Sequence, residues 1–542
     1  MIRLAVAVLA AIVAAPAWGA PGNVAIGLAP GVSPERVERA VETATGGRVV
    51  RVLGPLRSLV LAAGDVEKAV AAVRAVPGVE FAEPAGARRS LDFVPNDPLL
   101  PSQWYVSTIR AFDFWPEKPA LGPPVLVAVV DSGVDGTHPD LQGRILEAKT
   151  FVQGEATVDT IGHGTMVAGE IAAAIDNGVG IAGIAFPAQL LVAKVVDDEG
   201  EISLDAEARA IRWAVDRGAR VVNLSLGGPR NPDNTERDTY SALEQRAIDY
   251  AIRKGAVVVA ATGNCQELCP YKYASYPAAL AHVIGVSALA QSGETPAFSN
   301  RDVIYNDLAA PGKGVVATFP LALSDPACDQ LGYSVCALVE DYRRGEGTSF
   351  AAPLVSAAAA LVLSLRPDLA ASQVVALLER TALDIQEPGR DKESGNGQLD
   401  IATALAALAG PLPPADVFEP NDDAGTRAYT LWGPAREVEA TVDFFEDPTD
   451  VYRVRLRRGE RVTFRLRGPV GTDANLVLWR PGAKNVETFP PRGLVADVAN
   501  RPGARELLRF KADEGGWYFL QVKLSEGRGG AYRLSVEKIR PA

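Results

Sequence analysis

Three residues that together can activate a nucleophile stand within two positions of a glycine in this sequence. Asp131 lies in "VVDSGVDG", His163 in "IGHGTMVAG" and Ser349 in "EGTSFAAP". A serine hydroxyl attacks a carbonyl carbon when an imidazole takes its proton, and a carboxylate fixes the imidazole tautomer and stabilises the imidazolium. The three residue types, in the chain order Asp, His, Ser, therefore predict an activated serine nucleophile.

Each of these residues also has a simpler interpretation. Ser349 precedes a long apolar run, and serine is a preferred N-cap because its oxygen accepts a free N–H of the first helical turn. Asp131 alone is typical of a turn that ends a strand. His163 is more specific, because the chain has only three histidines and a glycine-flanked imidazole has little use in packing. We interpret the other two, His138 and His282, as structural.

The elements that must position these residues alternate between strand and helix over residues 93–409. Val-rich apolar runs that end in Gly, Ser, Asp or Asn predict strands, and helical periodicity follows over 202–218 and 239–255. Continuous apolar strands that alternate with helices predict an α/β fold with a mostly parallel sheet covered by helices on both faces. Ligands of such sheets bind beyond the carboxyl ends of the strands. The predicted strands are 124–133, 188–196, 219–228, 256–264 and 282–289.

Two smaller domains flank this α/β region. Residues 21–90 have a β-α-β-β-α-β order, which predicts a small ferredoxin-like α+β domain. The stretch "AGPLPPADVFEPNDDAG" is rich in Pro, Asp and Ala and predicts a linker, which we assign to residues 410–415. Residues 416–542 contain short alternating strands separated by Gly, Pro and Asn, which predicts an all-β sandwich.

Composition excludes some classes of partner. The net charge of −12 argues against a nucleic-acid partner, because neutralising phosphates requires a basic face.

Arg3, followed by an apolar run and small residues, predicts a signal peptide over 1–20, and hence a secreted protein with no membrane segment in its mature form. Export permits disulfides. The four cysteines form two close pairs, Cys265 with Cys269 and Cys328 with Cys336, although three connectivities are open.

Further motifs extend the pattern to a family resemblance. They are "VVDSGVDGTHPDL", "GHGTMVAG", "VVNLSLGG", "ATGN", "APG" at 310–312 and "GTSFAAPLVSAAAALV". With these motifs in this order, residues 93–409 resemble the subtilisin-like serine peptidases, or subtilases. The resemblance implies that Asp131, His163 and Ser349 form the catalytic triad and that Asn264 completes the oxyanion hole. It also implies that an edge of the sheet pairs with an extended peptide substrate. That edge comprises Ser225, Leu226, Gly227 and Gly228.

The resemblance has implications outside the triad. Residues 21–90 resemble an inhibitory propeptide, with processing expected near 88–94, and residues 416–542 resemble the bacterial pre-peptidase C-terminal domain. No cofactor is expected for the chemistry. Asp140 and Asn177 are the expected ligands of a structural calcium ion, which takes oxygen donors. The expected partners are protein or peptide substrates and the chain's own propeptide, and the expected state is a monomer.

These observations predict a secreted serine endopeptidase that is made as a precursor and processes itself. One alternative is a catalytically weak subtilase scaffold with a binding C-terminal domain. The presence of Asp131, His163, Asn264 and Ser349 argues against it. The other alternative is a serine esterase. The predicted sheet edge for an extended peptide argues against it.

Overall fold

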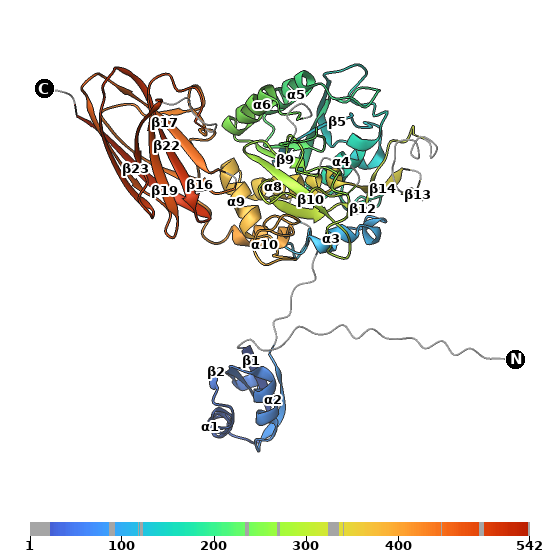
Figure 1. Cartoon of the computed structure of the whole chain (residues 1–542). Coiled ribbons are helices and arrows are strands. Elements are labelled where there is room, and N and C mark those ends of the chain that lie inside the picture. Colours follow the sequence, from blue (N-terminus) through green and yellow to red (C-terminus); the bar gives the residue numbers. More distant parts are fainter. Residues whose placement is uncertain are drawn as a thin grey trace. The chain divides into compact units, whose positions relative to one another are not determined.

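The computed structural model describes residues 22–85, 93–117, 119, 123–233, 238–267, 272–323, 335–339, 341–445, 447–486 and 493–539. The chain divides into two compact units, residues 1–91 and 92–542 (Figure 1). The predicted signal peptide over 1–20, residues 88–92 of the segment 88–94 in which processing is expected, and the cysteines Cys269 and Cys328 lie outside the described residues.

The first unit contains a four-stranded antiparallel sheet of order β2-β3-β1-β4 and two helices. The apolar residues Val24, Ile26 and Leu28 of β1 are buried and share one core with Val37 and Val73 of the helices. This is the predicted ferredoxin-like order. Its elements are β1 Gly22–Leu28, α1 Pro34–Thr45, β2 Arg48–Leu53, β3 Ser58–Ala63, α2 Val66–Arg74 and β4 Val79–Pro84.

The second unit is built on a seven-stranded parallel sheet, as the Val-rich runs predict. Both faces of the sheet are buried: Val127 and Val129 of β5 face one core, and Ala128 and Val130 face the other. In sheet order the strands are β11 Leu308–Pro311, β10 Val283–Leu289, β9 Val257–Ala261, β8 Val221–Leu224, β5 Val125–Asp131, β7 Ala188–Lys194 and β6 Ile145–Thr150.

Helices cover the two faces of this sheet. Helices α4, α8, α9 and α10 share one core, and α5 and α6 share the other (Figure 1). In the described part of this unit the α-helices are α3 Trp104–Thr108, α4 His163–Ala172, α5 Leu204–Asp216, α6 Ala242–Arg253, α8 Ala352–Leu365, α9 Ala371–Arg380 and α10 Ile401–Ala407. A small sheet lies beside them, with strands β12 Lys313–Thr318, β14 Tyr342–Glu346 and β13 Val335–Val339.

Helix α8 is the central helix of this part of the molecule. The stretch Thr348–Leu365 is long and apolar enough by composition to cross a membrane, yet 83% of it is buried inside the protein. It packs against β8, β9 and β10. Its composition therefore reflects a place in the core.

The C-terminal part is a β-sandwich, as its short alternating strands predict (Figure 1). The inward residues, including Tyr452, Phe464 and Tyr518, form one core between two sheets. One sheet has the order β15 Tyr429–Thr430, β17 Thr449–Leu456, β22 Gly516–Glu526, β19 Asp473–Trp479 and β20 Val495–Ala499. The other has the order β16 Ala435–Asp443, β23 Gly529–Ile539, β18 Arg461–Arg467 and β21 Arg505–Lys511.

Candidate active site

Asp131 and His163 meet at the carboxyl end of the parallel sheet. Asp131 is the last residue of β5, and His163 is the first residue of α4. The Nδ1 atom of His163 lies 2.8 Å from Oδ1 of Asp131, which also accepts the backbone N–H of Ser132 at 2.7 Å. The carboxylate is buried, whereas 23% of the imidazole is exposed. The imidazole is thus held at one nitrogen while part of the ring remains accessible.

Electrostatics favour the protonated form of His163. Burial alone would lower the pKa of the imidazole, but the charge of Asp131, the hydrogen bond to it and the charge of Asp159 raise that pKa above its ordinary value of 6.5. The pocket therefore stabilises an imidazolium, which is the form that a general base adopts after it has taken a proton.

Asp159 holds the turn that leads into α4, and the sequence analysis did not identify it. Its carboxylate, 4% exposed, accepts hydrogen bonds from Ser132 Oγ, the backbone N–H of Ile161 and Gly162, and both the N–H and Oγ1 of Thr165. Ser132 Oγ in turn accepts the N–H of Gly164. The only sequence signal for this role was an acidic residue four positions before His163.

Ser349 lies in a short 3₁₀ turn, Thr348–Phe350, that precedes α8. The N-cap of α8 is Ala351, so the interpretation of Ser349 as a helix cap is wrong. Gly347 permits the turn because its φ of 152° lies in a region that L side chains rarely adopt. The carbonyl of Ser349 accepts the hydroxyl of Ser225 at 2.7 Å, which fixes the turn to the end of β8.

The turn of Ser349 lies beside His163. The ring of Phe350 is centred 5.5 Å from the His163 ring, and the turn contacts α4. Between these described residues no hydrogen bond joins the Ser349 hydroxyl to the imidazole. Such bonds are often long without substrate and shorten when the reacting groups are bound.

The side chain of Asn264, which follows β9, has a fixed orientation. Its Oδ1 accepts both the N–H and the hydroxyl of Thr348, at 2.8 and 3.0 Å. Because both donors bind the amide oxygen, the amide nitrogen points away from Thr348. This nitrogen lies close to Gly347, since a Cβ atom built on Gly347 would be 3.0 Å from it. The amide N–H groups of Asn264 are thus presented at the turn that carries Ser349, from an exposed position.

The predicted substrate edge is shorter in the structure than in the sequence analysis. Gly228 exchanges both of its backbone hydrogen bonds with Tyr276, each at 2.9 Å, so its backbone is not open to a peptide. Gly227 is exposed, and Ser225 is buried with its hydroxyl on Ser349. The segment 225–227 is the part of the predicted edge that lies beside the turn of Ser349.

Asp140 and Asn177, the predicted calcium ligands, are hydrogen-bonded to each other. Asn177 Nδ2 donates to Asp140 Oδ1 at 2.9 Å, and Asp140 Oδ2 accepts from Ile181 N and the Tyr342 hydroxyl. The structure adds Asp97, which the sequence analysis missed and whose Oδ2 accepts Asp176 N at 2.8 Å. Burial raises the pKa of both carboxyls. The two buried carboxylates supply the oxygen donors that Ca²⁺ takes, whereas Asn177 turns its amide nitrogen toward Asp140 and its Oδ1 accepts Val179 N at 2.7 Å.

The other two histidines make contacts away from Ser349 and its partners. His138 accepts Asp140 N on Nδ1 and donates from Nε2 to the carbonyl of Asp341, at 3.2 and 3.0 Å, which is a structural arrangement. His282 binds Asp422 and Glu419 of the segment that enters the sandwich. Cys265 is disulfide-bonded, but the predicted pairings involve residues outside the described part of the chain.

Comparison with known proteins places this geometry in a family. The model of the subtilase family matches residues 122–397, which is just over half of the 542 residues, and the model of the fervidolysin N-terminal prodomain matches residues 20–85. Thermitase from Thermoactinomyces vulgaris is 35% identical over 307 residues, which cover 56% of this chain and 94% of thermitase.

Fervidolysin from Fervidobacterium pennivorans is a longer relative. It is 36% identical over 320 residues, which cover 55% of this chain and 42% of fervidolysin. Its crystal structure aligns with 91% of this chain and 69% of fervidolysin, with a TM-score of 0.49 and 24% identity. From the match to the subtilase family and the coverage of thermitase, we conclude that this chain belongs to the subtilase family and is a serine endopeptidase.

Proposed function

We propose that this enzyme cleaves peptide bonds through an acyl-enzyme formed on Ser349, with His163 as general base and Asp131 as its partner. The observation that carries the proposal is the 2.8 Å bond between His163 Nδ1 and Asp131 Oδ1. A proton on Nδ1 leaves the lone pair on Nε2, which is the nitrogen that can accept a proton from a hydroxyl.

In the first step Ser349 Oγ forms a bond to the scissile carbonyl carbon while its proton passes to His163 Nε2. The imidazolium is stabilised by Asp131, whose charge raises the pKa of His163. When the tetrahedral intermediate collapses, the C–N bond breaks and the proton moves from Nε2 to the leaving amine. Water then attacks the acyl-enzyme by the same path and regenerates the Ser349 hydroxyl.

Asn264 and the backbone N–H of Ser349 are the proposed donors to the oxyanion. The support for Asn264 is that Thr348 holds its oxygen, so its amide nitrogen is free to donate. Donors that are fixed before the reaction stabilise the developing charge without having to reorganise. The segment 225–227, of which Gly227 is exposed, is the proposed edge on which an extended peptide forms main-chain hydrogen bonds.

The proposed life history is that of a secreted precursor. Residues 1–20 act as the signal peptide, 21–90 as the inhibitory propeptide, 93–409 as the peptidase and 410–415 as a linker to the sandwich of 416–542, which resembles the bacterial pre-peptidase C-terminal domain. Support for the propeptide comes from the match to the fervidolysin prodomain over residues 20–85. Disulfides formed within each cysteine pair fit an exported protein.

Calcium has a structural part in this proposal. Asp97, Asp140 and Asn177 would hold the ion, and the ion would brace the loop 176–181 that follows α4. None of these residues takes part in the chemistry, so loss of the ion should lower stability before it changes the catalytic steps.

Substitution of the nucleophile tests the proposal. Ser349→Ala should lower casein hydrolysis by about 10⁶-fold and leave the precursor uncut, because loss of a triad nucleophile costs about that factor. The exposed Ser292 provides the matched control, and Ser292→Ala should act at the wild-type rate. Mass spectrometry of both secreted proteins reads the processing sites. Casein cleavage by Ser349→Ala at the wild-type rate would overturn the proposal.

A further inference from the structure

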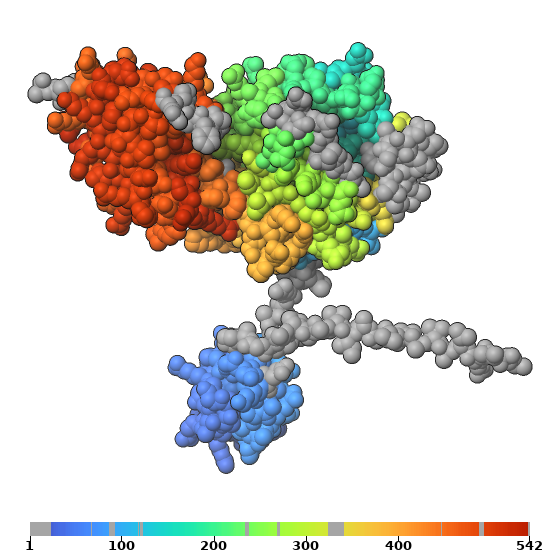
Figure 2. Space-filling model, viewed as in Figure 1, coloured from blue at the N-terminus to red at the C-terminus, as the bar shows by residue number. Residues whose placement is uncertain are grey.

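Two neighbouring strands of the C-terminal sandwich carry basic residues on their outer face. β18 and β21 are paired antiparallel, and alternate residues of both strands, including Phe464 and Leu508, point into the core of the sandwich. The residues between them point outward. Six of these outward residues are basic and exposed, and we call them the cationic face: Arg461, Arg465, Arg467, Arg505, Arg509 and Lys511. Figure 2 shows the sandwich that carries them in orange to red.

The register of the two strands places like charges opposite each other. Arg461 lies opposite Lys511, and Arg467 lies opposite Arg505. On its other side Arg467 lies opposite Arg533 of β23. Like charges in direct cross-strand pairs destabilise a sheet. The stability of the sandwich therefore does not explain this arrangement, which indicates a function for the charge.

Most of the cationic face has no ion pair in the part of the chain that the structure describes. The member with such a pair is Arg465, whose Nη1 atom lies 3.5 Å from Oε2 of Glu537. Arg533 of β23, by contrast, pairs with both Glu437 and Glu439 of β16. The whole chain has a net charge of −12, so the cationic face is a local reversal of the overall charge. A local field of this kind attracts an anionic partner.

The cationic face is narrow. The other two strands of the same sheet, β23 and β16, carry the exposed carboxylates of Glu437, Glu439 and Glu537 on the same side. A membrane of anionic lipid or a nucleic-acid duplex laid across the sheet would meet these carboxylates as well as the cations. A single chain that follows β18 and β21 for their seven residues, about 23 Å, lies over the cations and avoids the carboxylates. The arrangement therefore favours a linear polyanion.

The side chains of the cationic face suit carboxylate or sulfate groups. Five of the six are arginines, whose planar guanidinium can donate two parallel hydrogen bonds to such an acid group. Outward residues recur about every 7 Å along a strand, so an extended polymer with acid groups along its length can reach several of them. The other two outward positions of these strands hold Thr463 and Leu507, so neither strand offers an aromatic ring to stack the bases of a single-stranded nucleic acid.

The backbone at the centre of the cationic face is not available to a peptide. β18 is paired with β21 on one side and with β23 on the other along its whole length. Extended peptides are bound to sheets mainly through main-chain hydrogen bonds, which β18 therefore cannot offer. A polysaccharide needs only the side chains, and its stiff chain loses little conformational freedom on binding.

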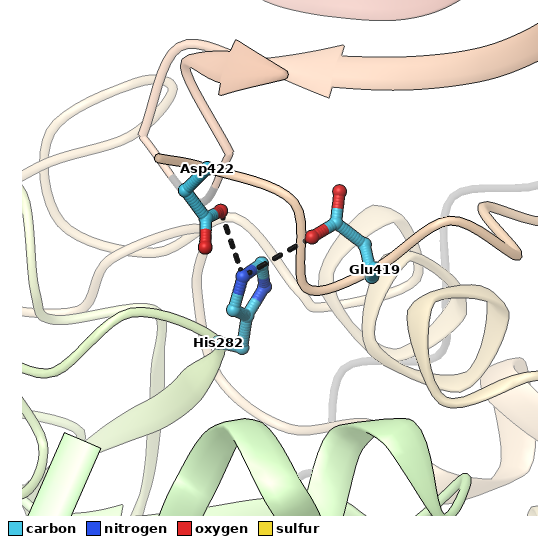
Figure 3. Close-up of side chains that lie close together, drawn as sticks. All are labelled: His282, Glu419 and Asp422. Carbon is cyan, nitrogen blue, oxygen red and sulfur yellow. Dashed lines mark hydrogen bonds and ion pairs between the residues drawn. The ribbon is translucent and has the colours of Figure 1, made fainter. Parts of the chain in front are cut away.

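The sandwich that carries the cationic face is also held to the peptidase by side-chain contacts. Nε2 of His282, just before β10, lies 2.8 Å from Asp422 Oδ1 and 3.2 Å from Glu419 Oε2 (Figure 3). Nε of Arg427 lies 3.2 Å from Oδ2 of Asp249 in α6. A polymer bound by the cationic face is therefore bound by the molecule that carries the triad.

We propose that the cationic face binds a linear anionic polysaccharide through its carboxylate or sulfate groups, and that this binding holds the peptidase on material that contains such a polymer. The site lies on a different domain from the triad and adds a binding function to the enzyme. Binding should weaken as salt is added, because it depends on exposed charges that ions screen.

Affinity for two defined polysaccharides tests this proposal. The full chain carrying Ser349→Ala, used to prevent self-cleavage, is titrated with heparin, which is sulfated, and with polygalacturonate, which carries carboxylates. Arg467→Glu in this background should weaken binding by about tenfold or more, because it removes one cation and places an anion beside Arg505. The control Arg455→Glu changes an exposed arginine on the outer face of the other sheet and should bind like the parent.

The melting temperature separates loss of binding from loss of the fold. Arg467→Glu converts a like-charge pair into a pair of opposite charges, so it should melt no lower than the parent. If it melts lower or does not fold, Arg509→Glu provides the same comparison.

Equal affinity of the parent and Arg467→Glu for both polysaccharides would overturn the proposal, as would a parent that binds neither of them. Tighter binding of poly-L-glutamate, duplex DNA or phosphatidylglycerol vesicles than of either polysaccharide would overturn the choice of partner.

Discussion

Nδ1 of His163 lies 2.8 Å from Oδ1 of Asp131, a residue that is only 2% exposed. The same oxygen accepts the backbone N–H of Ser132, so the orientation of the carboxylate is set by the end of β5. The imidazole is therefore placed by the sheet and fixed from one side only.

Asp131→Asn should lower kcat by about 10⁴-fold with little change in KM. An amide in place of the carboxylate favours the wrong imidazole tautomer and removes the charge that stabilises the imidazolium. Steady-state kinetics on a peptide substrate measure this change. A variant within tenfold of the wild-type kcat would show that Asp131 does not support the base.

The pH dependence of kcat/KM should follow the pKa of His163. Only the neutral imidazole accepts a proton, so activity should rise with pH through that pKa, which lies above 6.5 because the effect of Asp131 outweighs that of burial. In Asp131→Asn the pKa of His163 should be lower, because burial still lowers it and the charge of Asp131 no longer raises it. The increase of the residual activity with pH should therefore have its midpoint at a lower pH than in the wild type. A rise at the same pH in both proteins would contradict this assignment.

Asn264→Ala should lower kcat by about 10²- to 10³-fold and leave measurable activity, as expected for one oxyanion donor. Thr348→Val should cause a smaller loss, because it removes one of the two donors that orient the Asn264 amide. Single-turnover kinetics distinguish this effect from slower product release. Full activity in Asn264→Ala would exclude the proposed oxyanion hole.

Asp159→Ala should destabilise the peptidase and lower kcat together. The substitution leaves several buried donors of the turn before His163 without an acceptor, at a cost of about 1–3 kcal/mol for each buried group. Thermal unfolding and kinetics measure the two effects. Asp205→Ala, which removes an exposed carboxylate paired with Arg209, serves as the control and should change neither. An unchanged melting temperature in Asp159→Ala would contradict the role of this turn.

The sequence predicts the parts of this molecule that depend on local pattern. The parallel sheet follows from Val-rich runs that must be buried on both faces, and Asp131 and His163 follow from their places at a strand end and a helix start. The order of the N-terminal domain follows from alternating and helical periodicities.

The features that the sequence does not predict depend on contacts between distant segments. The pairing of Gly228 with Tyr276 and the approach of Asp97 to the loop 176–181 have no local signal. His282 has the pattern of a strand residue, and its partners Glu419 and Asp422 lie in another domain of the chain. Ser349 was expected to cap a helix, but it lies in a 3₁₀ turn that follows Gly347. The sequence shows that a glycine is present but not which backbone conformation it adopts.

Labelling with a fluorophosphonate tests the central claim most directly, because this reagent reacts with an activated serine. Peptide mapping by mass spectrometry should find one adduct per chain, on Ser349, and no adduct in His163→Ala. Ser349 unlabelled in the active enzyme, with the adduct on another residue, would contradict the proposed mechanism.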